Sequence, residues 1–169
     1  MAGTIGALWG ILGLSLILAR GLGCIYPFAH DLCGMKFGAV HWIGLAVSLI
    51  FMGYAEGYKG FQLKFAPRVA ARALYLKNNP TFVRVLFAPF FVMGYFHATK
   101  KRKIISFSIT AMVILLIVGV SQLTQPWRGI IDAGVLLGLG WGLLSVWVYS
   151  FKAFFGKGEY TISPETPDS

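Results

Sequence analysis

Long apolar runs separated by polar or basic segments dominate the pattern of this chain. Four runs approach the roughly 20 residues that a helix needs to cross a hydrocarbon core of about 30 Å. They are residues 4–22, 38–54, 104–123 and 129–151. The pattern therefore predicts an all-α, polytopic transmembrane helical bundle of four spans, with residues 1–155 as a single transmembrane domain.

A fifth apolar run, residues 82–98, can be interpreted in two ways. It carries Arg84 near its start and Pro89 in its middle, and a proline inside a helix kinks or breaks it. The run is either a re-entrant hairpin that dips into the membrane and returns, or a short fifth helix that crosses. Irregular backbone at membrane depth needs cover from protein or from a wet cavity.

The distribution of charge favours the re-entrant interpretation. Ten of the 15 basic residues lie between Lys59 and Lys103, mostly in one segment before the fifth run and one directly after it. Cytoplasmic loops carry an excess of Lys and Arg, whereas a crossing helix would place these two segments on opposite sides. Four spans with both termini in the cytoplasm satisfy this rule. Five spans remain the alternative, because the rule is a bias.

The high hydrophobic content and low charged content also indicate that lipid surrounds part of the protein. Hydrophobic residues make up 57% of the 169 residues and charged residues 12%, about half the charged fraction of a soluble domain. A chain of this size cannot bury so much apolar surface in its own core. We expect an integral protein of a bacterial inner membrane or an organellar membrane. The first run should stay as a span, since no basic segment precedes it.

The net charge of +9 points to anionic partners. The basic residues lie between apolar runs and no nucleic-acid-binding motif is present, so we expect anionic lipid headgroups and not nucleic acid. Basic residues four apart beside an apolar face also predict an amphipathic interfacial helix at about residues 67–77. The expected lipid- and anion-binding residues are Lys64, Arg68, Arg72, Lys100, Lys101, Arg102 and Lys103.

Few side chains outside this basic region could carry chemistry. Cys24 and Cys33 lie in a segment predicted to face the outside, where they form either a disulfide or two free thiols. Glu56, at the end of the second span, is a candidate with His97 for a polar cavity beneath the fifth run; a simple pair with Lys59 is the alternative. The sequence predicts no catalytic set and no metal site, and it identifies no cofactor.

Small residues at regular spacing indicate how the helices pack. Glycines spaced four apart let helix backbones approach closely, so we expect tight contacts of the first and last spans, within one chain or between chains. The polar, acidic C-terminal tail, residues 156–169, has the composition of a disordered segment. The packing glycines are Gly6, Gly10, Gly134, Gly138 and Gly142.

One segment resembles a motif of a known family. Residues 65–73, with Arg68 and Arg72, followed by Asn78, resemble the arginine-rich motif of the small membrane glutathione transferase and eicosanoid family. Those proteins are four-helix bundles that assemble as trimers, and the resemblance implies that Arg68 and Arg72 bind an anionic cofactor. It covers about 15 residues. The Glu that follows Asn in the family is missing here, and the stretch follows the second span instead of the first.

The pattern as a whole favours a protein without enzymatic activity. We expect an accessory or assembly subunit of a membrane complex, or a homo-oligomer, because packing glycines are frequent and no catalytic motif is evident. The partners would be other membrane subunits or copies of the same chain. A glutathione-transferase-type enzyme is the second hypothesis. A small channel or carrier, with Pro89 at its gate and Glu56 along its path, is the third.

Overall fold

The computed structural model describes residues 1–156 and 160–167. This part of the chain consists of helices, turns and loops without a strand, which confirms the all-α prediction. Four helical stretches are long and apolar enough to cross a membrane: 2–34, 39–78, 100–121 and 127–155. The elements are α1 (Ala2–His30), η1 (Asp31–Gly34), α2 (Ala39–Met52), η2 (Gly53–Phe65), α3 (Ala66–Asn78), α4 (Phe82–Leu86), α5 (Ala88–Met93), α6 (Lys100–Ser121) and α7 (Trp127–Phe155).

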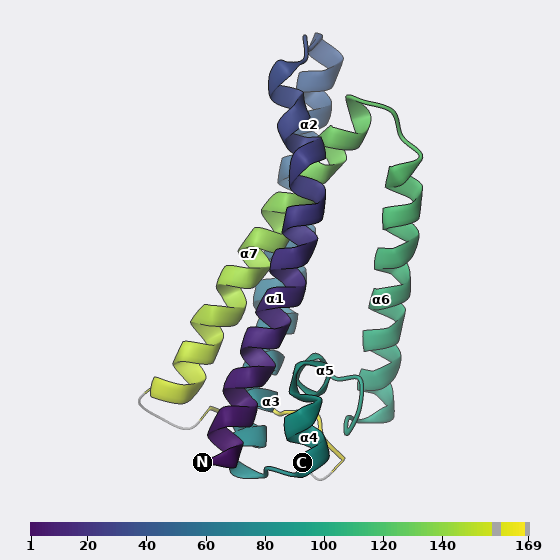
Figure 1. The fold of residues 1–169 in the computed structure, drawn as a ribbon. Helices are drawn as coiled ribbons and strands as arrows, with labels where there is room; N and C mark the ends of the chain where they lie inside the picture. Colours follow the sequence, from purple (N-terminus) through teal and green to yellow (C-terminus); the bar gives the residue numbers. More distant parts are fainter. Residues whose placement is uncertain (157–159, 168–169) are drawn as a thin grey trace.

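The long helices run up and down between two ends of an elongated bundle (Figure 1). The N-terminus, α3, α4, α5, the start of α6 and the C-terminal tail lie at one end, which we call the basic end. The other end holds η1, the start of α2, the end of α6 and the start of α7. Both basic segments of the sequence therefore lie at the same end of the molecule.

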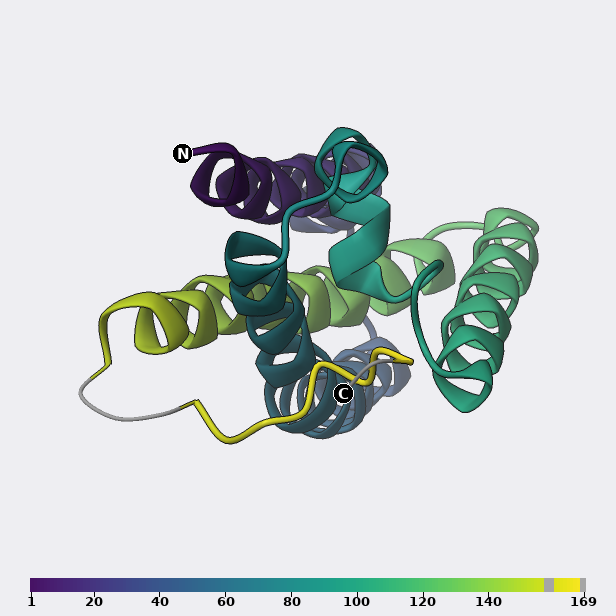
Figure 2. The same ribbon diagram turned by 90° about the horizontal axis from the view of Figure 1, so that it is seen from below.

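The second long helix is continuous from α2 to α3 and changes its hydrogen-bonding pattern on the way. Between them, η2 is a π-helix of 13 residues, whose backbone bonds join residues five apart. Such stretches are usually one turn long and often occur at functional sites. Gly57 in η2 allows close contact with α7, because a Cβ atom there would lie 3.2 Å from Cβ of Trp141. Beyond η2, α3 crosses beneath α7 at the basic end (Figure 2).

The fifth apolar run does not form one long helix. It forms two short helices of five and six residues, α4 and α5, separated at Phe87 and followed by Gly94 in the left-handed region at φ +87°. Pro89 is the second residue of α5 and lies in its first turn, where its missing N–H has no helical partner to lose. Eleven helical residues rise only about 17 Å, and the chain enters and leaves this segment at the basic end (Figure 1).

The residues expected to form an interfacial helix do form a helix, α3, but its basic face is not free. Eight of its 13 residues are buried, and Arg72 is 0% exposed. Arg72 therefore does not lie on an open face of the helix, and its binding of an anion stays a prediction. The physical reason is cover from several directions, since α3 packs against α1, α5 and α7. An amphipathic pattern does not distinguish a helix on a membrane from one covered by other segments.

The glycine rows on α1 and α7 lie in tight contacts with neighbouring segments. On α1, a Cβ atom at Gly6 would lie 2.9 Å from Cγ2 of Val85, and one at Gly10 would lie 3.0 Å from Cγ1 of Val92. The row on α1 therefore receives α4 and α5. The row on α7, at Gly134, Gly138 and Gly142, faces α2 and η2 through Ser48, Glu56 and Phe61. Both pairings lie within one chain.

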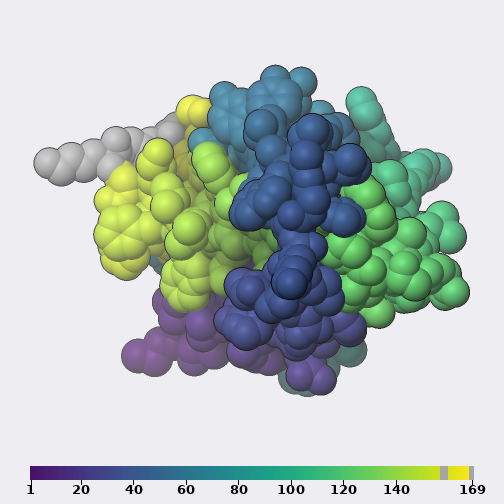
Figure 3. All heavy atoms as spheres, turned by 90° about the horizontal axis from the view of Figure 1, so that it is seen from above, coloured from purple at the N-terminus to yellow at the C-terminus, as the bar shows by residue number. Residues whose placement is uncertain are grey.

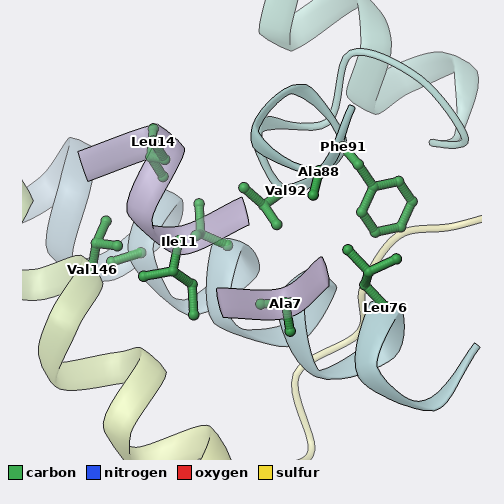
Figure 4. Packing of buried hydrophobic residues seen from close by; sticks show 11 residues of the cluster. Ala7, Ile11, Leu14, Leu76, Ala88, Phe91, Val92 and Val146 are labelled. Atoms are coloured by element: carbon green, nitrogen blue, oxygen red, sulfur yellow. The ribbon is translucent and has the colours of Figure 1, made fainter. Parts of the chain in front are cut away.

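The main hydrophobic core lies near the basic end, where α1, α3, α5 and α7 meet (Figure 4). Alanines supply much of α3's share, and their small side chains let the neighbouring helices approach closely. The buried cluster comprises Ala7, Ile11, Leu14, Ala66, Val69, Ala73, Leu76, Ala88, Phe91, Val92 and Val146.

One long helix stands apart from this core. Residues 111–119 of α6 are exposed on every side, and the helix lies at the margin of the molecule in views from below and from above (Figures 2 and 3). Its hydrogen bonds to the rest of the bundle come from its first three turns, where Ser106 Oγ donates to Met93 O at 3.0 Å and Thr110 contacts Tyr95.

The α1–α5 contact makes a testable prediction. The Gly13→Ala change places a methyl group into the ring of Pro89, and we expect it to destabilise the fold by about 1–3 kcal/mol, as overpacking does. Gly21→Ala in the same helix meets no atom within 4 Å, so it should gain up to about 1 kcal/mol of helix propensity. Unfolding midpoints in detergent compare the two. A Gly13→Ala protein as stable as Gly21→Ala would contradict the packing.

Candidate functional site

The guanidinium group of Arg72 is buried among main-chain carbonyl groups. Its Nε donates to Phe91 O at 2.6 Å, and Nη2 donates to Phe96 O at 2.9 Å and to His97 O at 3.1 Å. These carbonyls belong to the end of α5 and the loop before α6; Phe91 O also accepts from Gly94 N at 3.0 Å, whereas no helix continues past residue 93 to pair those of Phe96 and His97. The planar guanidinium also lies over the ring of Phe91, with Cζ 4.3 Å from its centroid. Arg72 therefore fixes the path of the chain between α5 and α6.

The C-terminal tail closes the same site from the other side. Arg72 Nη1 donates to Pro164 O at 2.8 Å, and Thr99 N donates to Glu165 O at 2.9 Å. Tyr160 Oη donates to Pro67 O at 3.0 Å. Burial and the nearby Tyr149 raise the pKa of Tyr160 to about 12, so its hydroxyl keeps its proton near neutral pH. The tail, for which composition predicts disorder, thus contacts α3 and the start of α6.

Two further arginines meet the carboxylate of Glu165. Arg68 Nε of α3 lies 3.4 Å from Oε1, and Arg102 Nε of α6 lies 3.7 Å from Oε2. Arg102 is 3% exposed. It fits against the loop because residue 94 is glycine: a Cβ atom there would lie 3.0 Å from Arg102 Nε, at a backbone conformation that other residues rarely adopt. The three arginines, Glu165 and Thr99 together form what we call the arginine site.

The start of α6 adds to the positive potential around the arginine site. Thr99 caps this helix, with its Oγ1 accepting from Arg102 N at 3.3 Å. Four consecutive basic residues follow the cap, although cations are unfavourable at the positive end of a helix dipole. A negative group beside this turn is therefore favourable, and Glu165 supplies one. Lys100 and Lys101 are exposed, and Lys103 is half-buried.

The arginine site includes some of the expected lipid- and anion-binding residues. Arg68 and Arg102 point at one carboxylate, while Arg72 beneath them uses its donors on main-chain oxygens. Lys64 is exposed on η2. Binding of lipid or another anion by any of these residues stays a prediction. The sequence pattern missed Glu165 and Gly94. An acidic tail opposite a basic segment is the signal that could have suggested Glu165.

The other candidate residues do not form a site. Glu56 lies half-buried on η2 against Gly138 of α7, whereas His97 is exposed in the loop before α6. Cys24 and Cys33 are exposed free thiols, and Cys24 lies within helical α1, so the structure does not show a bond between them. Within the described residues, no group of three or more His, Cys, Asp and Glu side chains could hold a metal ion.

The arginine site makes a testable prediction about stability. Arg72→Met removes the side-chain donor from the carbonyls of residues 96, 97 and 164, while Phe91 O keeps its bond from Gly94 N. Each unsatisfied buried group costs about 1–3 kcal/mol. We expect a loss of at least about 3 kcal/mol in detergent unfolding. Lys77→Met, at an exposed position of the same helix, should change stability by less than about 0.5 kcal/mol. Equal effects of the two changes would show that Arg72 does not hold these segments.

Comparison with known proteins gives no relative from which a role for this site could be transferred. No protein-family model, no curated protein and no solved structure matches the chain.

Proposed function

We propose that this protein is a non-enzymatic integral membrane subunit that assembles with partner subunits, or with copies of itself, through α6. The supporting observation is the isolation of this helix: residues 111–119 are exposed on every side, although α6 has the highest hydropathy of the four long helices, 2.5. Between membrane helices, association comes from close packing and not from exclusion of water. A helix outside its own bundle keeps its full surface for such packing.

An apolar groove at the base of α6 supports the same proposal. It has a volume of about 560 Å³ and lies between the α4–α5 segment and the first turns of α6. Aromatic side chains provide much of its wall, and they offer large contact areas to an entering apolar side chain. The lining residues are Val83, Phe87, Phe90, Tyr95, Phe96, Phe107 and Thr110. A partner helix along α6 would meet this groove at its end.

We place the basic end in the cytoplasm. The N-terminus, the described tail residues 160–167 and both basic segments lie there (Figure 1), and the positive-inside rule assigns such an end to the cytoplasmic face. In this orientation α4 and α5 form a re-entrant segment that begins and ends on the cytoplasmic side. Lys64, Lys100 and Lys101 are then exposed where anionic lipid headgroups lie.

The two alternative functions have less support. A glutathione-transferase-type enzyme would need Arg72 for its anionic cofactor, but the donors of Arg72 are used by main-chain oxygens. A channel would need Pro89 and Glu56 along one path. Pro89 packs against Gly13 of α1, whereas Glu56 packs against Gly138 of α7.

The orientation can be tested by cysteine accessibility in sealed vesicles. In a chain without Cys24 and Cys33, we expect Asn78→Cys and Lys100→Cys both to react with a membrane-impermeant thiol reagent from the cytoplasmic side, because both lie at the basic end (Figure 1). The native Cys33, exposed at the other end, should react from the opposite side. Labelling of positions 78 and 100 from opposite sides would exclude the re-entrant topology.

Assembly through α6 can be tested by photo-crosslinking in native membranes. A photoreactive residue at Ile114 on α6, which is 55% exposed, should give a protein adduct several-fold more often than one at Ile50 on α2, which is 73% exposed. An adduct of about twice 18.5 kDa identifies a second copy, and another mass identifies a different subunit. Lipid adducts alone at both positions, with only monomers by native mass measurement, would overturn the proposal.

A further inference from the structure

The carboxylate of Glu165 bridges two arginines that belong to different helices. Its oxygens lie 3.4 Å from Nε of Arg68 and 3.7 Å from Nε of Arg102. Charge-assisted N–H···O bonds are typically about 2.7–2.9 Å long. One planar carboxylate thus spans two donors without approaching either closely. A larger tetrahedral anion, with oxygens in several directions, would fit the same space better.

The site also contains a donor that the fold leaves unused. Nε of Arg102 is buried and has no hydrogen-bond partner, on a side chain that is 4% exposed. Buried donors in folded proteins are nearly always paired, so an unpaired one pointing at an anion indicates room for a better acceptor. Arg68 and Glu165 are about a third exposed, at 30% and 33%. A ligand can therefore reach this donor from the open side.

Charge at the site exceeds what Glu165 can neutralise. One carboxylate faces the guanidinium groups of Arg68 and Arg102, with Arg72 close enough to interact electrostatically with Arg102 and Glu165. The first turn of α6 contributes the positive end of its dipole and three lysines. A phosphate monoester carries about −1.5 to −2 charges near neutral pH, which balances this cluster better than a single carboxylate does.

The present occupant is also held in an unfavourable backbone conformation. Glu165 has φ +52°, a region that residues other than glycine rarely adopt because the Cβ atom clashes with the main chain. Departure of the tail would relieve this strain. Docking of Glu165 in the site therefore carries a conformational cost that a separate ligand would not have.

We propose that the arginine site binds a phosphate group, and that Glu165 of the C-terminal tail occupies it as an internal competitor. The ligand class is a terminal phosphate group on the cytoplasmic side, either the phosphate monoester headgroup of an anionic lipid or a free phosphate ion. Arg68 and Arg102 contact it directly, while Arg72 contributes charge from beneath. This site does not depend on α6 having a partner helix, so assembly and phosphate binding can fail separately.

The test uses the full chain in detergent, with short-chain phosphatidic acid, short-chain phosphatidylcholine and inorganic phosphate as probes. Glu165→Gln keeps the size of the side chain but removes the competing charge. We expect it to bind phosphatidic acid about tenfold more tightly than the unmodified chain does, as for a site that its competitor fills about nine-tenths of the time. Titration calorimetry or native mass measurement gives the affinities.

The controls separate this site from general electrostatic attraction. Adding Arg68→Gln to Glu165→Gln should abolish the gain. Adding Lys77→Gln, at an exposed position on the same helix, should preserve it. Binding of inorganic phosphate as tight as that of phosphatidic acid identifies the free ion as the ligand; binding of the lipid alone identifies the headgroup. Unchanged affinity in Glu165→Gln, or equal losses from the Arg68 and Lys77 changes, would overturn the proposal.

A second measurement leaves the arginine site unchanged, in case Glu165→Gln fails to fold. Thr166 follows Glu165 in the docked tail and is 1% exposed. In a chain without Cys24 and Cys33, Thr166→Cys should react severalfold faster with a soluble thiol reagent when the identified phosphate ligand is added. Phosphatidylcholine should have no effect. Reactivity that no phosphate compound changes would show that Glu165 is a structural ion-pair partner and not a competitor.

Discussion

The buried guanidinium of Arg72 is the interaction on which the basic end depends. Four carbonyl oxygens, from the end of α5, the loop before α6 and the tail, converge on it. Phe91 O also accepts from Gly94 N, but without Arg72 the other three carbonyls would lose this donor beside the hydrophobic core. Segments far apart in the sequence are therefore held together by hydrogen bonds to one side chain. The position of α6 follows from it, because α6 begins only a few residues after two of these carbonyls.

Glycines determine how closely the long helices approach one another away from Arg72. The row on α1 accepts α4 and α5, and the row on α7 accepts α2 and η2. Hydrogen bonds fix the loops at the basic end, and close backbone contacts fix the helices above it. Because both rows are filled from within the chain, α6 is left as the long helix without a comparable contact along its middle. The isolation of α6 is thus a consequence of the other helices filling one another's glycine rows.

The sequence predicted the helices well and their contacts poorly. The four long runs appear as helices, since span length and apolar composition are local properties. Helix α3 was also predicted, but not the burial of Arg72, because the same pattern suits a basic face on a membrane. The partners of Gly6 and Gly138 depend on where α4, α5 and η2 lie, which local spacing does not encode. The role of Glu165 depends on a contact between segments about 60 to 100 residues apart.

The π-helical stretch η2 has a consequence for the direction of α3. Each residue of an α-helix turns the chain by about 100°, so the wider winding of η2 sets a different angular phase between α2 and α3. Glu56 and Phe61 face the glycine row of α7 from η2, while Arg72 faces α5 and the tail from α3. The winding between Gly53 and Phe65 therefore acts as an angular offset, which aligns two faces of one continuous, bent helix with two different neighbours.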